Sequence, residues 1–419
     1  MGSRTFVKQK PVPLTEQLKI KRSHLAGIDL VLLTALIFIV VFGLIMVYSA
    51  STDYSVVVLD QAPTYMFFRQ VLWLLIGSLL AGSLVFIDYH HFQKLAVPII
   101  VITIVGLLLV VIFGEFRNGA IRTFYNGSIQ PSEFAKVATI IYLSVWLYRK
   151  KETLHIVNMG LVPLGVIVGV IAGLIFLQPD LSATITIIIL GILLFFLADG
   201  ELKQMGLIFL VAGISVALLI SVWPYGKDRI ASFIQILRDP TTAQGQSRRF
   251  LSAIINGKFF GVGLGRSNAK LTGLEVAPTD SIFAVLVEET GLLGAIILIA
   301  LYGILIWRGL RISSRAPDML GSLMAAGLTF WIGIEAIINM GMIVGILPVA
   351  GNALPFISAG GSSLVSYLIA TGILMNISRQ GNDEKKVEER RLYGASVDWR
   401  GRDRRRRVSR PRRTASNAH

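Results

Sequence analysis

The chain has 419 residues, 54% of them hydrophobic, and a formal net charge of +15 at pH 7. A mean hydropathy of +0.68 excludes a soluble globular protein, because such a protein needs polar surface on every side. The absence of cysteine excludes disulfides and thiolate metal sites, and the five histidines show no spacing typical of a zinc site.

Ten stretches are long and apolar enough to cross a bilayer. A spanning helix needs about 20 mostly apolar residues for roughly 30 Å of hydrocarbon. The stretches lie near residues 28–50, 67–87, 94–114, 134–148, 159–177, 181–198, 204–223, 281–307, 319–345 and 364–378. The sequence therefore predicts an all-α polytopic membrane protein with a transmembrane domain over residues 28–380. We expect no cleavable signal peptide before it.

Charge predicts the orientation of these spans. With an even number of spans both termini lie on one side, and most of the 40 Lys and Arg residues fall in the terminal tails (1–27 and 381–419) and the alternate loops. That side is expected to be cytoplasmic. The charged, repetitive tail after residue 380 is expected to be disordered and to contact anionic lipid, with RNA binding as the less favoured alternative.

The segment NGAIRTFYNGSIQPSEFAKVA, between the third and fourth spans, places charges at the membrane edge. Its QPSE motif is typical of a helix start, with Ser132 as the cap and Glu133 in the first turn. Glu133 and Lys136 are three residues apart and would pair on one helix face. This pairing leaves Arg122 unexplained. Further along, Gln178-Pro179-Asp180 predicts a tight turn between the fifth and sixth spans.

The long connection over residues 224–280 is expected to be extracytoplasmic, yet it is basic. Either a long loop escapes the charge rule, or it meets an anionic ligand on the outer face. Two apolar stripes at helical spacing predict short helices lying on the bilayer surface. The glycines at 261, 263 and 265 fit an anion-binding nest or, more simply, a flexible turn. The basic residues of the loop are Lys227, Arg229, Arg238, Arg248, Arg249, Lys258, Arg266 and Lys270, and the stripes are Ile230, Phe233, Ile234 and Leu237, then Phe250, Leu251, Ile254 and Ile255.

Acidic residues also interrupt the last apolar stretches. Asp280 lies where a helix N-cap would be, and Glu288 and Glu289 follow about two turns later. Glu335 and Asn339, four residues apart, share a face of the ninth span. Because a charge at the bilayer centre costs about 2.5 to 3.5 kcal/mol, such acids must face protein or a water-filled cavity. For Glu335 and Asn339, hydrogen bonding between helices is an equally good explanation.

Five stretches together resemble the SEDS family, which includes RodA and FtsW. They are QPSEFAKVATIIYLSVWL, QPDLSAT, GKFFGVGLGRSNAKL, PTDSIFAVLVEETGLLG and INMGMIVGILPVAGNALPFISAGGSSLVSYLIATGILMNISR. The resemblance implies a ten-helix glycosyltransferase of the bacterial cytoplasmic membrane. Such an enzyme polymerises lipid II, the undecaprenyl-diphosphate-linked disaccharide peptide, into peptidoglycan. The implied partners are a class B penicillin-binding protein and other divisome or elongasome proteins, and no nucleic acid.

The family's essential outer-face aspartate corresponds to Asp280 in Thr279-Asp280-Ser281-Ile282-Phe283, which makes Asp280 the expected catalytic residue. One carboxylate suffices as a general base, because the lipid diphosphate is already a good leaving group; glycosidases need two carboxylates. The other assignments are hypotheses. Arg122, Lys136, Arg248 and Lys270 would hold the diphosphate. Glu133 would orient Lys136, and Ser132 belongs to the same substrate-binding group. Glu288 and Glu289 would orient the eighth helix or face the cavity.

The sequence departs from the family pattern near this motif. Pro278 stands where a His is usual, Ser281 where a Phe is usual, Thr123 where a Trp follows the Arg, and Ser182 where a Gly is common. These changes put the standard pose of lipid II in doubt. Two rival functions are a lipid II flippase using Glu335 and Asn339, and a scaffold that only recruits a penicillin-binding protein. The AKLTGLEV segment and the long basic tails slightly favour a resemblance to FtsW over one to RodA. We expect no protein-only metal site, although Mg²⁺ or Mn²⁺ could be shared with the diphosphate.

Overall fold

A computed structural model describes residues 27–117, 120–123, 129–200, 204, 206, 210, 213, 224–239, 242–270 and 277–382. Side chains are described over the same ranges except at residues 115–122 and 224–228. The predicted tails at 1–26 and 383–419 and most of the predicted seventh span lie outside these residues, so the count of ten spans stays a prediction.

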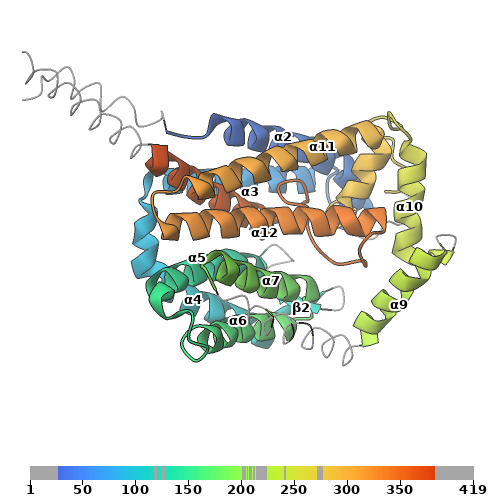
Figure 1. Cartoon of the computed structure of the whole chain (residues 1–419). Helices are drawn as coiled ribbons and strands as arrows, with labels where there is room; N and C mark the ends of the chain where they lie inside the picture. The colour runs from blue at the N-terminus through green and yellow to red at the C-terminus, as the bar shows by residue number, and fades with distance from the viewer. Residues whose placement is uncertain are drawn as a thin grey trace, which may run out of the picture.

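The described part is a bundle of long helices that lie roughly side by side (Figure 1). Nine of the ten predicted spans are helical, and six described helices are long and apolar enough to cross a membrane. The all-α, multi-pass architecture is therefore confirmed. The helices are α2 (Leu30–Val57), α3 (Tyr65–Phe86), α4 (Phe92–Phe113), α5 (Pro131–Lys150), α6 (Leu161–Phe176), α7 (Leu181–Leu197), α11 (Ile282–Ser314), α12 (Met319–Val344) and the last helix, Gly361–Asn382.

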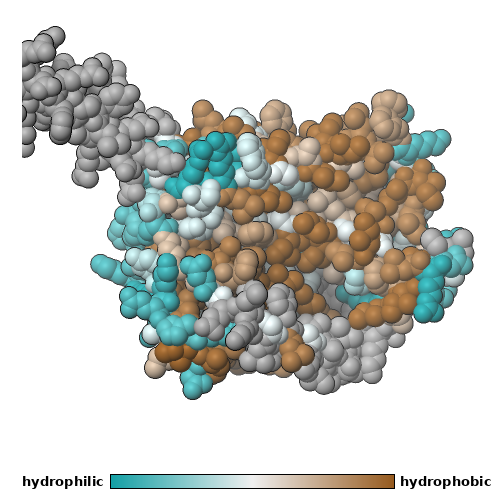
Figure 2. Space-filling view, viewed as in Figure 1, coloured by the Kyte–Doolittle hydropathy of each residue, from teal (hydrophilic) through white to brown (hydrophobic). Residues whose placement is uncertain are grey.

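The chain enters and leaves the bundle at one end. The amide of Asn382 donates a hydrogen bond of 2.8 Å to the carbonyl of Gly27, so the first and last described residues meet. We call this the terminal end, and the opposite end the distal end. Polar residues gather toward the two ends of the molecule, and apolar residues cover the surface between them (Figure 2). This distribution is what a bilayer-spanning bundle requires.

Three shorter elements lie at the distal end. A two-stranded antiparallel hairpin joins α4 to α5, with β1 at Glu115–Arg117 and β2 at Ala120–Thr123. The long loop contains α9 (Pro224–Arg238) and α10 (Gly245–Gly257), which confirms the two helices predicted from its apolar stripes. The apolar residues of α10 differ in exposure. Phe250 is buried against the bundle, whereas Ile255 is 72% exposed.

Helix α12 and the last helix organise the interior. Helix α12 packs against α11, α5 and α7, and so joins the α2–α3–α11 group to the α4–α7 group (Figure 1). The last helix is buried along nearly its whole length, unlike the other candidate spans. Close packing requires glycine here, because a Cβ at Gly372 would lie 2.7 Å from the carbonyl oxygen of Ala81 in α3.

Local sequence explains where several helices begin. Asp29, Asp180 and Asp318 each accept a hydrogen bond from a backbone N–H in the first turn of α2, α7 and α12. Two predicted caps are wrong. Helix α5 begins at Pro131 after Gln130, so Ser132 is already inside the helix, and α11 is preceded by Ser281 rather than by Asp280.

Candidate functional site

Asp280 lies at the distal end of the bundle, directly before α11. The residue is partly exposed, whereas the following residues Ser281, Ile282 and Phe283 are buried. Ser281, rather than Asp280, occupies the N-cap position of α11. The position combines a fixed backbone with a side chain that water or a substrate can approach.

Three successive carbonyls fix this backbone. The N–H of Ala359 donates to the carbonyl of Pro278 over 2.8 Å, and the hydroxyl of Ser358 donates to the carbonyl of Thr279 over 2.6 Å. The amide of Asn339 then donates to the carbonyl of Asp280 itself over 2.9 Å. We call these contacts the backbone clamp. Side chains placed on such fixed backbone lose little freedom when a substrate binds.

The clamp is itself held by α3. The side-chain amide of Gln70 donates to the carbonyl of Ser358 over 3.1 Å, and its carbonyl oxygen accepts from the N–H of Gly360 over 3.2 Å. Gln70 is buried although it lies in a membrane-spanning helix, and these two bonds satisfy its polar atoms. Helices α3, α12 and the segment before the last helix therefore all act on the position of Asp280.

A buried group of three charges lies beneath the clamp. The ammonium of Lys136 is 2.9 Å from Glu133 and 2.7 Å from Glu335, and its side chain is only 1% exposed. Trp331 and Tyr367 also donate to the Glu335 carboxylate, over 3.2 and 3.3 Å. We call Glu133, Lys136 and Glu335 the ion triad. It joins α5 to α12 by charge-assisted hydrogen bonds in the interior of the bundle.

The ion triad connects to the clamp through Asn352. The amide of Asn352 donates to the backbone carbonyl of Glu335 over 3.1 Å, and the carbonyl of Asn352 accepts from Asn339. Of the two explanations left open for Glu335 and Asn339, hydrogen bonding between segments is the one that the structure displays. Both residues act on the backbone around Asp280.

The geometry corrects the predicted contact between Lys136 and a diphosphate. The ammonium already faces two carboxylates and is closed off from solvent, so in this conformation it offers no charge to a ligand. The expected pairing of Glu133 with Lys136 is present. Ser132 is fully buried and donates to Asp180 over 3.2 Å, which holds the start of α5 to the turn before α7.

The adjacent acids Glu288 and Glu289 point to different partners. Glu289 accepts from Ser49 of α2 over 2.6 and 2.7 Å and lies 3.5 Å from the ammonium of Lys270. Lys270 also donates to the carbonyl of Gly265 over 2.7 Å. Lys270 was predicted to hold diphosphate, but its side chain is 8% exposed and is used to tie the loop to α2 and α11.

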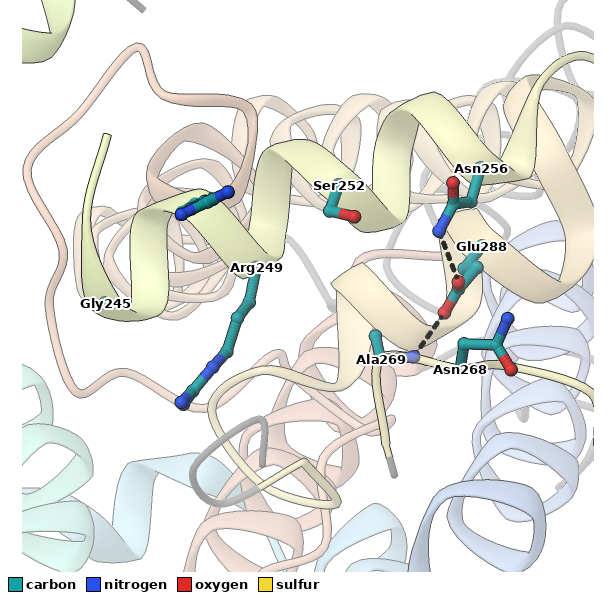
Figure 3. Close-up of a pocket in the computed structure, with 8 residues that line it drawn as sticks. Gly245, Arg249, Ser252, Asn256, Asn268, Ala269 and Glu288 are labelled. Atoms are coloured by element: carbon teal, nitrogen blue, oxygen red, sulfur yellow. Dashed lines mark hydrogen bonds between the residues drawn. The ribbon is translucent and has the colours of Figure 1, made fainter. Parts of the chain in front are cut away.

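Glu288 organises the loop after α10. Its carboxylate accepts from the N–H of Ala269 over 2.9 Å, from the amide of Asn256 over 3.2 Å, and from the hydroxyl of Ser267. The carboxylate borders a pocket that is also lined by α10 and by the turn at Asn268 and Ala269 (Figure 3). Glu288 is thus the acid that faces a cavity, a choice that helix periodicity left open.

The glycine-rich segment is neither an anion nest nor a free turn. The N–H groups of Val262 and Gly263 donate to the carbonyls of Glu288 and Glu289, both over 3.0 Å. These carbonyls are available because α11 is broken at Gly291, which has φ of 70°. A Cβ at Gly291 would lie 2.4 Å from the backbone nitrogen of Gly261. Glycine is required on both sides of this contact, which we call the loop–kink junction.

Arg248 and Arg122 complete the predicted set. Arg248 is exposed on α10 and borders the same pocket as Glu288. The backbone of Arg122 belongs to β2, but its side chain lies outside the described residues. Among the described residues, no group of three or more His, Asp or Glu side chains is arranged to hold a metal, so the shared Mg²⁺ or Mn²⁺ stays a prediction.

Sequence reasoning missed several residues that shape the site. Gln70, Asn352 and Ser358 hold the backbone clamp, and Ser49 anchors Glu289. One signal was available: Gln70 is a polar residue inside an apolar span, and such residues find partners in the bundle. Asn352 and Ser358 lie in an irregular segment whose path depends on tertiary packing.

Comparisons with known proteins find relatives over most of the chain. Residues 29–383 match the model of the FtsW/RodA/SpoVE family, described as cell cycle proteins. The chain is 36% identical to a probable peptidoglycan glycosyltransferase FtsW of Geobacter sp. strain M18, over 84% of this chain and 97% of the relative. It is 37% identical to stage V sporulation protein E of Bacillus subtilis, over 84% of this chain and 97% of the relative.

Solved structures show the same fold. A chain of a peptidoglycan synthase complex, studied for its coordination of polymerization and crosslinking, superposes with a TM-score of 0.69 at 25% identity, covering 84% of this chain and 98% of that one. The rod shape determining protein RodA of Thermus thermophilus superposes with a TM-score of 0.63 at 25% identity, covering 84% of this chain and 97% of that one.

Proposed function

Because this chain belongs to the FtsW/RodA/SpoVE family and is a peptidoglycan glycosyltransferase, we propose that it polymerises lipid II with Asp280 as the general base. The observation that carries the assignment of Asp280 is the backbone clamp. Three consecutive carbonyls at Pro278, Thr279 and Asp280 are each held by a donor from another segment. Asp280 therefore combines a fixed backbone with partial exposure.

The chemistry needs one proton acceptor. The acceptor sugar hydroxyl gives its proton to the Asp280 carboxylate as its oxygen attacks the anomeric carbon of the donor. The bond between that carbon and the diphosphate oxygen breaks, and the lipid diphosphate departs with the electron pair. Since this anion is stable without protonation, the site needs no second carboxylate as a general acid.

The basic residues divide into two roles. Lys136 and Lys270 are paired with carboxylates, and we assign them to positioning the clamp and the loop. Arg248 is exposed and meets an anionic group of the substrate. Arg122, on β2, keeps its predicted contact with the diphosphate as a proposal. A divalent cation, if the reaction uses one, would be held by the diphosphate as much as by protein.

The cellular setting follows from the same family membership. We infer a class B penicillin-binding protein as the partner that cross-links the strands, supported by the superposition on a peptidoglycan synthase complex. The setting would be the bacterial cytoplasmic membrane, with both termini cytoplasmic and the distal end outside. Relatives named FtsW and a sporulation protein support a role in division-type wall synthesis more than in elongation.

The rival flippase and scaffold functions gain no support from the described residues. A flippase would need Glu335 and Asn339 along a polar path, but both are enclosed and committed to hydrogen bonds. A scaffold would have no use for a partly exposed acid held by the clamp. Lys136, Glu335 and Asn339 instead connect separate segments near the distal end.

Polymerisation of purified lipid II in detergent tests this function. The wild type and Asp280→Asn would each be purified with a class B penicillin-binding protein whose transpeptidase is inactivated, and glycan length would be measured. We expect polymer from the wild type alone, because the amide of Asn accepts no proton at neutral pH. Equal polymer from both would remove Asp280 from catalysis, and none from either would disprove the polymerase function.

A further inference from the structure

The pocket between α10 and α11 is a second feature of the distal end that the clamp does not explain. Its volume is about 420 Å³, within the roughly 300–1,000 Å³ of pockets that hold small molecules. It is partly open to solvent. The lining residues are Gly245, Arg248, Arg249, Ser252, Asn256, Asn268, Ala269 and Glu288.

The pocket is elongated along α10. Gly245, Arg249, Ser252 and Asn256 recur at spacings of four, three and four residues, so they lie on one face of the helix (Figure 3). At 1.5 Å of rise per residue, this face extends for about 16 Å. A groove of that length fits a chain of one or two sugar rings better than a compact ion.

One end of the pocket adjoins the catalytic residue. The amide of Gln246, in the first turn of α10, donates to the hydroxyl of Ser281 over 3.1 Å. Ser281 is next to Asp280 in the chain, and Gln246 is between Gly245 and Arg248, which line the pocket. A ligand in the pocket would therefore have one end close to Asp280.

The charges are distributed unevenly along the pocket. Arg248 and Arg249 lie at the end near Ser281, while the middle and far end offer neutral donors and acceptors from Ser252, Asn256 and Asn268. Both oxygens of the Glu288 carboxylate at the far end already accept hydrogen bonds. The lining thus suits a ligand that is anionic at one end and rich in hydroxyl and amide groups along the rest.

We propose that this pocket binds the saccharide of the substrate, with the anionic group of that saccharide at Arg248, which is exposed. The proposal rests on the polymerase function and adds a binding site to it. Two sources share this chemistry: a disaccharide peptide with carboxylate groups, as on the acceptor strand, and a disaccharide diphosphate, as on the donor. In either case the sugar rings lie along Ser252 and Asn268.

Ser252→Leu tests the pocket without touching the clamp. Ser252 is exposed on α10, and a leucine there would fill the middle of the cavity. Arg248→Gln removes the charge at one end. The matched control is Ile255→Ala, on the same helix but outside the pocket, where the side chain is 72% exposed. All three would be made in the full chain bound to its penicillin-binding protein.

Direct binding of three soluble probes would be measured for each variant: a disaccharide pentapeptide without phosphate, the same disaccharide with a 1-diphosphate but no lipid, and inorganic diphosphate. We expect Ser252→Leu to raise the dissociation constant of at least one of the two saccharides by about 10-fold or more. We expect Ile255→Ala to change neither dissociation constant. The saccharide whose binding is weakened shows whether the pocket holds the acceptor strand or the donor. Loss confined to inorganic diphosphate, or wild-type affinity for both saccharides, would overturn the proposal.

These outcomes are independent of polymerisation. If the wild type makes no glycan but binds a saccharide through Ser252, the polymerase proposal fails and the saccharide site stands. If the wild type makes glycan and Ser252→Leu binds both saccharides normally, the polymerase stands and the pocket proposal fails. In an active enzyme, Ser252→Leu is expected to raise KM with little change in kcat.

Discussion

The ion triad and the pocket under α10 both contain charged side chains in a membrane protein, but they use them in opposite ways. In the triad, Lys136 faces two carboxylates and is 1% exposed. In the pocket, Arg248 is exposed on a surface helix. A closed charge network of this kind stabilises the fold, whereas an exposed charge such as Arg248 can still meet a ligand.

Lys136→Met should produce the largest loss of stability and would test whether the ion triad stabilises the fold. The variant leaves two buried carboxylates without their counter-charge, which should lower the free energy of unfolding by about 3–5 kcal/mol. The midpoint of thermal unfolding in detergent measures the effect. If the closed-network account is right, the triple variant Glu133→Gln, Lys136→Met, Glu335→Gln recovers part of the loss. A Lys136→Met protein as stable as the wild type would contradict it.

Asn339→Ala should produce a smaller loss of stability but a clear loss of activity. It removes the amide that donates to the carbonyls of Asp280 and Asn352. Each buried carbonyl that loses its donor lowers the free energy of unfolding, and we expect a total loss of about 1–3 kcal/mol. Because Asp280 would lose its fixed position, we expect glycan synthesis to fall by roughly 10- to 100-fold. Activity at the wild-type level with lowered stability would remove the clamp from catalysis.

Gly291→Ala would disrupt the loop–kink junction between the glycine-rich segment and α11. The new Cβ would meet backbone atoms of Phe259 and Gly261 at 2.4 Å, and φ of 70° is unfavourable for alanine, so we expect a cost of about 1–3 kcal/mol. Faster proteolysis of residues 256–270 would report opening of the loop–kink junction. The control is Gly303→Ala in the same helix, where a Cβ meets nothing within 4 Å and proteolysis should not change.

Arg248→Gln should have the smallest effect on stability and would test whether Arg248 contributes to binding rather than to folding. The side chain is exposed, and we expect a change within about 0.5 kcal/mol. The thermal midpoint should match the wild type, while the KM for lipid II rises. A fall in stability like that of Lys136→Met would show that the guanidinium belongs to the fold, and the contrast between the two regions would disappear.

The sequence predicted the large-scale architecture because hydrophobic runs of bilayer length carry that information. It also predicted that Glu133 pairs with Lys136, since a spacing of three residues determines the contact locally. The two amphipathic helices of the long loop followed from local periodicity in the same way.

The sequence could not predict contacts that depend on distant segments. Glu335 lies 199 residues from Lys136, and its role follows only from the packing of α12 on α5. The break in α11 at Gly291 was also missed, because the loop that satisfies it starts 30 residues earlier and its glycines suggested a flexible turn. The caps expected at Ser132 and Asp280 were each misplaced by one or two residues, a limit common to helix boundaries.

The most direct test of the account compares Asp280→Asn with Lys136→Met, measuring thermal unfolding and lipid II polymerisation on the same samples. The account predicts that Asp280→Asn keeps its thermal midpoint close to that of the wild type and loses glycan synthesis by about 1,000-fold or more. Lys136→Met should lose stability and activity together. The account is contradicted if Asp280→Asn is as unstable as Lys136→Met, or if it still makes glycan at the wild-type rate.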